Sequence, residues 1–485
     1  MFTDVFPKLN GTQFVISLRG FFRSAAYPAF LAAMMTFSEL FSLEAFVFWI
    51  FFALGALATL FGEDALPVAP LFCCYYMSVS GANNVGKHET TIFSDPSFAL
   101  QMIMISVLAA LLLGGRLAVR LIFHPVRKKP SLVYGFLALG AAYALGGAFS
   151  GYYGIRTAFF GFVQILSLCG VYFYFYYTVD WTRARKDFAA RVFFALGCAL
   201  VIQTVGMYFQ PWVNLEKFNR SMLYTGWGIY NNVGCALAMC LPSAFYFAVK
   251  RRNGWFFTLC GSLMLLGVLL TQSRSAILFG SFVYCLCACI VLFSAKGRER
   301  AKHLVLFGAL LVALAICFFV FREKLLALFY SLLKNGFASE GREKIYAACW
   351  EKFLTRPLFG VGFYETPGGL LDDGSVGDLL PCPPDAFLPP RAHNTVLQLL
   401  TSGGIAAFLA YAFHRVQTLV LFFRRPTTEK TFLGLCIVAL LLTSLLDCHF
   451  FNFGPGILYS FLLVCAEGET RREESAKNLR ARISY

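Results

Sequence analysis

The residues of this 485-residue chain best suited to chemistry stand at the start of an apolar segment. The stretch PPRAHNTVLQLL, residues 389–400, puts Arg391, His393 and Asn394 directly ahead of that segment. An imidazole titrates near neutrality and can accept a proton, and an arginine binds anions through forked N–H donors. A lone histidine is more often structural than catalytic. The role of these residues therefore depends on the elements that hold them and on what lies beside them.

Two other arginines stand at the ends of predicted helices. Arg274, with Ser273 before it, falls in the run LTQSRSAILFG, a turn of very few residues between two apolar segments. Arginines at helix ends often reach lipid headgroups, so lipid contact is one interpretation of Arg274. Arg342 opens a predicted helix, where the dipole disfavours a cation but the N–H groups of the first turn favour an anion. Both arginines are candidates for binding an anionic group.

The composition requires that these residues be positioned by helices in a membrane. The chain is 58% hydrophobic and only 14% charged, and 55 of its residues are Phe. A soluble core could not bury so much apolar surface, and phenylalanine suits helices that face lipid. We therefore predict an all-α polytopic membrane protein. The net charge of +15 lies mostly in connecting loops and does not indicate a nucleic-acid partner.

About 14 apolar runs have the length of a membrane-spanning helix. The predicted spans are residues 24–41, 44–62, 65–82, 98–123, 131–150, 158–179, 188–209, 227–249, 254–271, 275–294, 303–321, 394–413, 431–448 and 453–467. The closely spaced early segments leave open whether two short spans form one re-entrant element. Almost no ionisable residue falls near the middle of a predicted span, which argues against an ion-coupled transporter.

The Lys and Arg residues of the loops set the predicted orientation. With the N-terminus in the cytoplasm, the basic segments HPVRKKP, TRARK, KRRNG, AKGRERAK, RRPTTEK and RREESAKNLRAR all fall on the cytoplasmic side. Both termini are then cytoplasmic. The predicted domains are a transmembrane bundle over residues 1–321, a large outer loop over 322–393, C-terminal transmembrane helices over 394–470 and a cytoplasmic tail over 471–485.

Few basic residues remain for the outer side. They are Lys87, Arg156, Lys217, Arg220, Arg274, Arg322, Lys324, Lys334, Arg342, Lys344, Lys352, Arg356 and Arg391. Among them, Arg156, Arg220 and Arg391 are candidates for substrate binding. Asp447 and His449, in the run LLDCHFFNFG, also fall at the outer end of a span, where this pair is either structural or an aid to chemistry.

The large outer loop contains the segment GREKIYAACWEKFLTRPLFGVGFYE. Its apolar residues recur at helical spacing and predict one amphipathic helix, lying along the membrane interface or over the bundle. These residues are Ile345, Tyr346, Cys349, Trp350, Phe353 and Leu354. A loop of this length is usually functional. A disulfide between Cys349 and Cys382 is one possibility.

Four elements in this order resemble the O-antigen ligase and polymerase family of membrane glycan transferases. They are the Ser-Arg turn at Arg274, the Gly-Arg-Glu start of the helix at Arg342, the segment PLFGVGFYE, and the His393-Asn394 pair that opens the next span. The resemblance covers residues 260 to 410. In that family the last element is His, a small amide or hydroxyl residue, nine residues, Gly, two residues, then Gly, Thr or Tyr. Here the final position is Ala407, which departs from the pattern.

The resemblance implies transfer of an undecaprenyl-diphosphate-linked glycan to an acceptor sugar hydroxyl at the outer face of the bacterial cytoplasmic membrane. It implies an inverting, metal-independent reaction without a cofactor, in a GT-C-like helical bundle. The implied partners are the lipid-linked glycan donor, a glycan or lipid-glycan acceptor, and membrane lipid. His393 would accept the proton of the acceptor, and Arg274 and Arg342 would neutralise the leaving diphosphate. Ser273, Asn394, Arg156, Arg220 and Arg391 would contact substrate.

Alternatives remain open. A polymerase and a ligase differ only in the acceptor, and Ala407 slightly favours a polymerase. A flippase or exporter of the same lipids would need no proton acceptor but could still use the arginines. A non-catalytic membrane scaffold would use the large loop to bind a partner.

Overall fold

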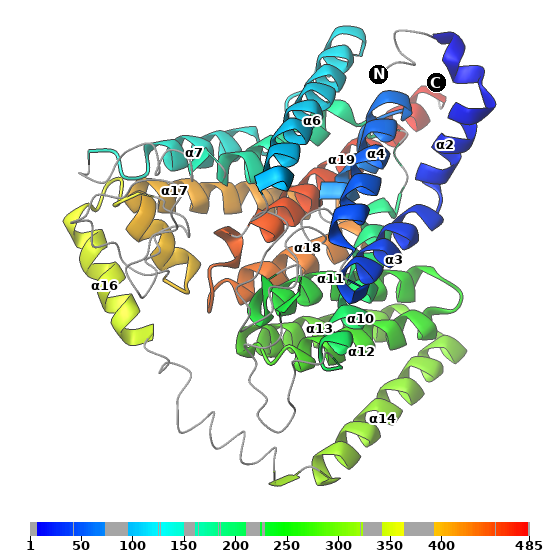
Figure 1. Cartoon of the computed structure of the whole chain (residues 1–485). Helices are drawn as coiled ribbons and strands as arrows, with labels where there is room; N and C mark the ends of the chain where they lie inside the picture. The colour runs from blue at the N-terminus through cyan, green and yellow to red at the C-terminus, as the bar shows by residue number, and fades with distance from the viewer. Residues whose placement is uncertain are drawn as a thin grey trace.

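A computed structural model describes residues 7–41, 43–72, 96–124, 126, 128–149, 161–162, 164–182, 184, 186–209, 224–225, 228–320, 322–323, 342–362, 392–451 and 453–483. Within these residues the chain is a bundle of helices (Figure 1). The helices are α2 (Gln13–Arg23), α3 (Ala26–Phe41), α4 (Glu44–Phe61), α6 (Pro96–Phe123), α7 (Val133–Leu145), α9 (Val171–Thr178), α10 (Phe188–Met207), α11 (Tyr230–Lys250), α12 (Gly254–Leu270), α13 (Arg274–Ser294), α14 (Gly297–Val320), α16 (Arg342–Thr355), α17 (Thr395–Phe423), α18 (Thr428–Thr443) and α19 (Phe453–Ile483).

Short elements connect these helices. They are the 3-10 turns η1 (Pro7–Gly11), η2 (Leu66–Val68) and η7 (His449–Phe451), the π-helical turn η4 (Leu166–Gly170), and the antiparallel strand pair β1 (Tyr224–Thr225) and β2 (Gly228–Ile229). Because η4 precedes α9, the predicted span 158–179 is not one regular helix over its described part.

Among the described residues, five helical segments have the length and hydropathy needed to cross a membrane. They are Met104–Phe123, Phe188–Met207, Tyr230–Lys250, Arg274–Ser294 and Thr395–Phe423. Shorter apolar helices cover Ala26–Ser38, Phe46–Phe61, Val133–Leu145 and Gly254–Leu270. The chain is therefore a helical, polytopic membrane protein. The count of about 14 spans stays a prediction, since residues 73–95, where the third predicted span ends, lie outside the described residues.

Two predicted boundaries differ from the structure. α19 runs unbroken through the predicted limit between membrane and tail, and α17 continues to Phe423, past the predicted end at residue 413. The longer α17 places His414 and Arg415 inside a membrane-length helix, past the end of the predicted span. The rings of Tyr411, Phe450 and Tyr459 surround the Arg415 guanidinium at 4.3–4.7 Å, which makes its burial tolerable.

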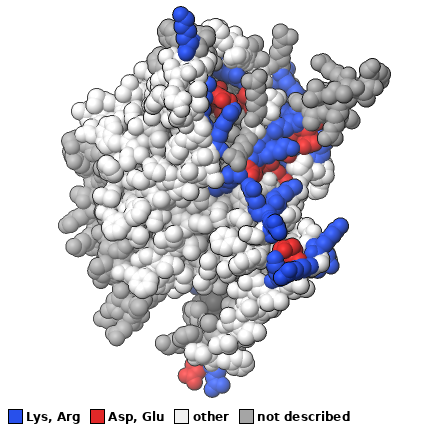
Figure 2. Space-filling view, turned by 90° about the vertical axis from the view of Figure 1, so that its right-hand side faces the viewer, with Lys and Arg blue, Asp and Glu red and all other residues white. Residues whose placement is uncertain are grey.

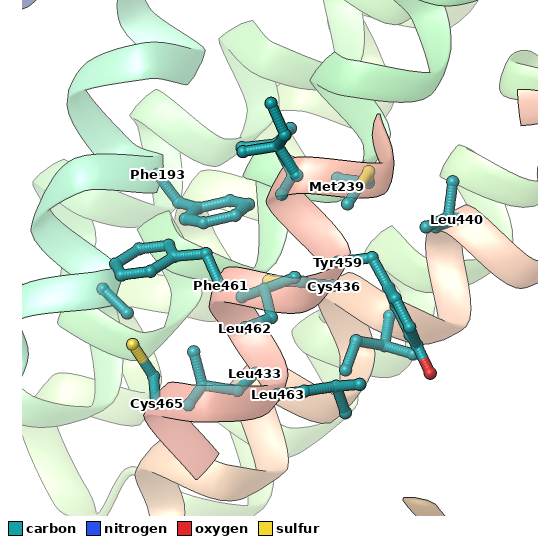
Figure 3. Packing of buried hydrophobic residues seen from close by; sticks show 14 of the residues in the cluster. Phe193, Met239, Leu433, Cys436, Leu440, Tyr459, Phe461, Leu462, Leu463 and Cys465 are labelled. Atoms are coloured by element: carbon teal, nitrogen blue, oxygen red, sulfur yellow. The ribbon is translucent and has the colours of Figure 1, made fainter. Parts of the chain in front are cut away.

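The core of the bundle is formed by α10, α11, α18 and α19. Nearly every residue of α11 between Val233 and Ala248 is buried, as is α19 from Ile457 to Ala466. Figure 3 shows side chains of these helices interdigitating, with the rings of Phe193 and Phe461 stacked against each other at 6.5 Å. A helical segment that is apolar all round packs in the interior. These segments of α11 and α19 therefore form the centre of the bundle.

The basic segments predicted to be cytoplasmic meet at one end of the bundle, which we name the charged end. Glu474 of α19 pairs with Lys128, with Arg424 at 3.4 Å and with Arg425 at 3.5 Å. These contacts join three basic segments that are far apart in the sequence. Figure 2 looks onto this end and shows Lys and Arg mixed with Asp and Glu in one region, while most of the remaining described surface lacks them.

The opposite end of the same helices, which we name the site end, lies at the left of Figure 1. α11 and α13 begin there and run toward the charged end, whereas α18 begins at the charged end and finishes here. α17 also begins at the site end and reaches the charged end at Arg424. The arrangement separates the two ends as the predicted topology requires. Which end faces the cytoplasm stays a prediction.

Candidate active site

His393 lies beside a nearly buried carboxylate at the site end. Its Nδ1 is 3.3 Å from Asp447 Oδ1. The His393 side chain is 33% exposed, whereas that of Asp447 is 7% exposed. A carboxylate next to one ring nitrogen favours the tautomer that carries its proton there, which leaves Nε2 as the acceptor. The pair therefore has the arrangement of a general base oriented by a carboxylate.

Two further donors fix the Asp447 carboxylate. The Asn231 side-chain amide donates to Oδ2 at 3.0 Å, and the backbone N–H of Cys448 donates to Oδ1 at 2.7 Å. Asn231 is in the first turn of α11, and Asp447 follows the end of α18. With both oxygens held, the carboxylate cannot rotate away from His393, so the orientation of the imidazole is set by two core helices.

The backbone around His393 also constrains it. The backbone of His393 has a φ of +45°. Residues other than Gly rarely adopt this left-handed conformation. The next residue, Asn394, caps α17: its Oδ1 accepts the N–H groups of Val396 and Leu397 at 2.9 and 3.0 Å. Its Nδ2 donates to the Leu445 carbonyl at 3.2 Å. Because backbone groups engage both ends of this amide, Asn394 positions His393, and its predicted contact with substrate stays a prediction.

The turn that contains Arg274 packs against the same first turn of α11. A Cβ on Gly234, three residues after Asn231, would lie 2.7 Å from the Ala276 Cβ and 2.9 Å from the Thr271 hydroxyl. Only a glycine permits so close an approach at this point. The start of α11 therefore contacts both Asp447 and the Arg274 turn, which brings the two predicted catalytic regions to one end of one helix.

Within this turn the two predicted residues differ in exposure. Arg274 is the first residue of α13 and is half-buried, whereas Ser273 is completely buried. The Ser273 hydroxyl lies 3.4 Å from that of Ser275. The Ser273 side chain thus supports the turn from inside, and its predicted contact with substrate is not visible in this arrangement.

Gly404 marks a break in α17, into which the segment PLFGVG fits. Gly404 has φ of +65° and ψ of −164°, and a Cβ there would lie 2.3 Å from the Leu358 carbonyl oxygen. Four backbone hydrogen bonds cross between the two segments: Ile405 to Pro357 and Ala406 to Leu358 in one direction, and Val361 to Thr401 and Gly362 to Ser402 in the other, at 2.8–3.1 Å. They satisfy groups that the break removes from the helix.

This contact joins two elements of the resemblance that are separate in the sequence. The nine-residue spacing between His393-Asn394 and Gly404 is the length of helix from the cap to the break. Ala407, the position that departs from the family pattern, is fully buried beyond the break. Its side chain is a packing residue, so the departure gives no direct evidence about the acceptor.

α16 is the predicted amphipathic helix, and it packs on α17. Cys349 and Phe353 are buried, whereas Trp350 and Leu354 are exposed. Thr401 donates its hydroxyl to the Cys349 carbonyl at 3.2 Å. Burial raises the pKa of the Cys349 thiol to about 11, with the Thr401 hydrogen bond acting in the opposite direction. α16 therefore covers the part of α17 that lies between His393 and Gly404.

The other predicted residues can be placed only in part. Arg342 is the first residue of α16, at the helix start that the sequence predicts. Arg156, Arg220 and Arg391 lie outside the described residues. Cys382, the suggested disulfide partner of Cys349, does so as well.

Sequence reasoning missed the role of Asn231 and left that of Asp447 undecided. It paired Asp447 with His449, two residues away, but His449 is fully buried and its Nε2 is 3.9 Å from Asp447. The histidine that meets Asp447 within hydrogen-bonding distance is His393. A signal for Asn231 was its position: an amide at the start of an otherwise apolar span, at the outer end of the predicted topology.

A comparison with known protein families matches the part of the chain that contains most of the candidate site. No curated protein matches the chain significantly. Residues 259–412 match a family model described as O-antigen ligase. The matched segment includes the Arg274 turn, α16, the Gly404 break and His393, while Asn231 and Asp447 lie outside it and complete the site from the flanking helices. Over residues 259–412, this chain is similar to the O-antigen ligase family.

Proposed function

We propose that this protein transfers a lipid-linked glycan to an acceptor hydroxyl at the site end, with His393 as the base. The observation that carries the proposal is the chain of contacts from Asn231 to Asp447 to His393, which leaves the imidazole Nε2 directed away from its carboxylate partner. The match of residues 259–412 to the O-antigen ligase family supports a glycan ligase or polymerase.

In the proposed reaction, the acceptor oxygen forms a bond to the anomeric carbon of the donor sugar. Its proton passes to His393 Nε2, and the bond from the anomeric carbon to the lipid diphosphate breaks. The departing undecaprenyl diphosphate carries the electron pair, and Arg274 and Arg342 would stabilise its charge. Arginine suits this role because its guanidinium stays protonated at any relevant pH.

The choice of donor follows from the predicted location of the site at the outer face of the membrane. At the outer face of a bacterial cytoplasmic membrane no nucleotide supply exists, so a donor already activated as a lipid diphosphate fits the reaction. The polymerase and the ligase share this chemistry and differ in the acceptor. A flippase for the same lipids would use the arginines but would gain nothing from a carboxylate-oriented imidazole.

The test follows release of undecaprenyl diphosphate from an undecaprenyl-diphosphate oligosaccharide, using purified protein and candidate acceptors. His393→Asn is the matched variant, because Asn tolerates a positive φ better than Ala but provides no comparable base. We expect release to fall about 10²–10⁴-fold while the thermal transition of the protein is retained. Arg274→Lys, which keeps the charge but loses the fork, should reduce release less than Arg274→Ala.

Unchanged release in folded His393→Asn and Arg274→Ala proteins would contradict the catalytic assignment. If wild-type protein releases no undecaprenyl diphosphate with any acceptor but moves the donor across liposome membranes, the flippase is the correct function. A product that grows by repeated donor units identifies a polymerase, and a single transfer to a lipid glycan identifies a ligase.

A further inference from the structure

A groove on the surface of α3, α10 and α12 lies outside the proposed active site. Its volume is about 670 Å³. Its lining includes the small side chains of Ala29, Ala32, Ala33, Ala195 and Ala199, together with the rings of Phe37, Phe194, Phe247 and Phe257. Ala29 and Ala33 are exposed, so the groove is open to the surroundings of the bundle. A row of alanines in a chain this rich in phenylalanine leaves an apolar hollow that the lining side chains do not fill.

The length of the groove corresponds to one leaflet of a membrane. Along α10 its lining runs from Arg191 to Ile202, and along α3 from Ala25 to Phe37. At a rise of 1.5 Å per residue these stretches measure about 16–18 Å. Half of a hydrocarbon core of about 30 Å is about 15 Å. An acyl chain that enters at one boundary would therefore reach the far end of the groove near the middle of the membrane.

The mouth of the groove is at the charged end and carries two guanidinium groups. Arg191 donates to both oxygens of Asp187 at 3.1 and 3.0 Å, and Arg251 donates to one of them at 3.2 Å. One carboxylate thus faces two cations, and the Arg251 side chain is 47% exposed. Lys250 and Arg252, on either side of it in the chain, are exposed as well.

The ion pairs at this end join three carboxylates to three arginines, so the positive excess comes from the exposed Lys250 and Arg252. Glu429 of α18 and Glu469 of α19 both pair with Arg472 of α19. Their charges are directed at that arginine, whereas Arg251 lies above the ring of Phe247, a groove residue, at 5.7 Å. The mouth of the groove therefore combines an accessible guanidinium with an apolar channel directly beside it.

We propose that this groove binds an anionic phospholipid from the leaflet at the charged end, with one acyl chain along the alanines and the phosphate against Arg251. Because the acyl chain leaves surroundings that are already apolar, its affinity comes from van der Waals contact with the groove and not from the hydrophobic effect. The guanidinium fork supplies the preference for a phosphate with a net negative charge. The site is independent of the glycan chemistry at the other end of the bundle.

The experiment counts lipids retained by the purified full-length protein in native mass spectrometry, after exchange into phosphatidylglycerol or phosphatidylcholine. We expect the wild type to retain one phosphatidylglycerol more than Ala33→Phe, which fills the groove from an exposed position without entering the core. Arg251→Gln should weaken retention of phosphatidylglycerol about fivefold, the effect of one juxtamembrane cation, and reduce the preference over phosphatidylcholine.

Two matched variants control for general changes in the surface. Ala110→Phe adds the same ring to an exposed position of α6, and Arg298→Gln removes an exposed cation at the start of α14; neither residue lines the groove. Both should retain the wild-type number of lipids. If Ala33→Phe retains as many lipids as the wild type, the proposal is overturned. If it abolishes a dimer with the number of lipids per chain unchanged, the groove binds a second copy of the chain, and the proposal is equally overturned.

Discussion

The two ends of the bundle use charge in opposite ways. At the charged end, Glu474 forms ion pairs with basic residues of two loops, and Asp187 forms ion pairs with two arginines. These ion pairs join residues that are far apart in the sequence. At the site end, the carboxylate of Asp447 is held by two N–H donors and faces an imidazole that is partly exposed. Surface ion pairs contribute little stability each. Acidic residues therefore join separate segments at the charged end, whereas at the site end one acidic residue orients an imidazole.

The largest effect is expected at the break in α17. Gly404→Val would place a branched side chain at φ of +65° and against the Leu358 carbonyl, combining backbone strain with overpacking of about 1–3 kcal/mol each. We expect a strong loss of folded protein, measured by the thermal transition and by monodisperse yield in detergent. Gly308→Val in α14, where a Cβ meets nothing within 4 Å, should have little effect. Equal losses in both variants would mean that the break does not fix the fold.

The second-largest effect is expected on the rate of transfer, when a carboxylate is removed from one end of the bundle or from the other. Asp447→Asn removes the charge beside His393 with little change of shape, so glycan transfer should fall about 10–100-fold while the protein stays folded. Glu474→Gln, at the charged end, removes a carboxylate with more ionic partners and should leave transfer within about twofold, because exposed ion pairs contribute little. The measurement is the rate of undecaprenyl diphosphate release. A larger loss in Glu474→Gln than in Asp447→Asn would reverse our assignment of the two ends.

A smaller effect compares two helix caps. Asn394 caps α17 at the site end with two hydrogen bonds, and Thr427 caps α18 at the charged end with one. Loss of a cap costs about 0.5–2 kcal/mol, so Asn394→Ala should lower the thermal transition more than Thr427→Ala. Asn394→Asp keeps the cap acceptor but loses the donor to Leu445. If Asn394→Asp is stable yet inactive, Asn394 contacts substrate as the sequence predicts; if it is stable and active, its role is to position His393.

The smallest effect concerns the reactivity of the Cys349 thiol toward maleimide. Burial raises the pKa of the Cys349 thiol to about 11, and the thiolate is the reactive form. Maleimide labelling of the Cys349 peptide, read by mass spectrometry, should therefore be slow at pH 7.5 and rise with pH toward that value. Glu343→Cys, exposed in the first turn of the same helix, should label rapidly. Rapid labelling of Cys349 at pH 7.5 would show that α16 does not stay packed on α17.

The sequence predicted most helices because a run of about 18 apolar residues has few alternatives in a membrane. It failed where side chains from other helices decide the outcome. The predicted span ends at residue 413, whereas α17 continues through Arg415, whose charge is surrounded by three aromatic rings from α17, η7 and α19. For Asn394 the sequence does not separate contact with substrate from positioning of His393, since a helix cap and a ligand for substrate look the same in a sequence.

The amino-acid sequence is sufficient to predict a helical membrane protein, basic segments on one side, and His393, Arg274 and Arg342 at helix starts. Periodicity, hydropathy and loop charge are local properties, so the chain reveals them without a fold. The tertiary structure alone decided that Asp447 orients His393, that Asn231 holds Asp447, and that Gly234 lets the Arg274 turn approach. These contacts join residues separated by 54 and 216 positions, and packing of α11, α17 and α18 is what brings them together.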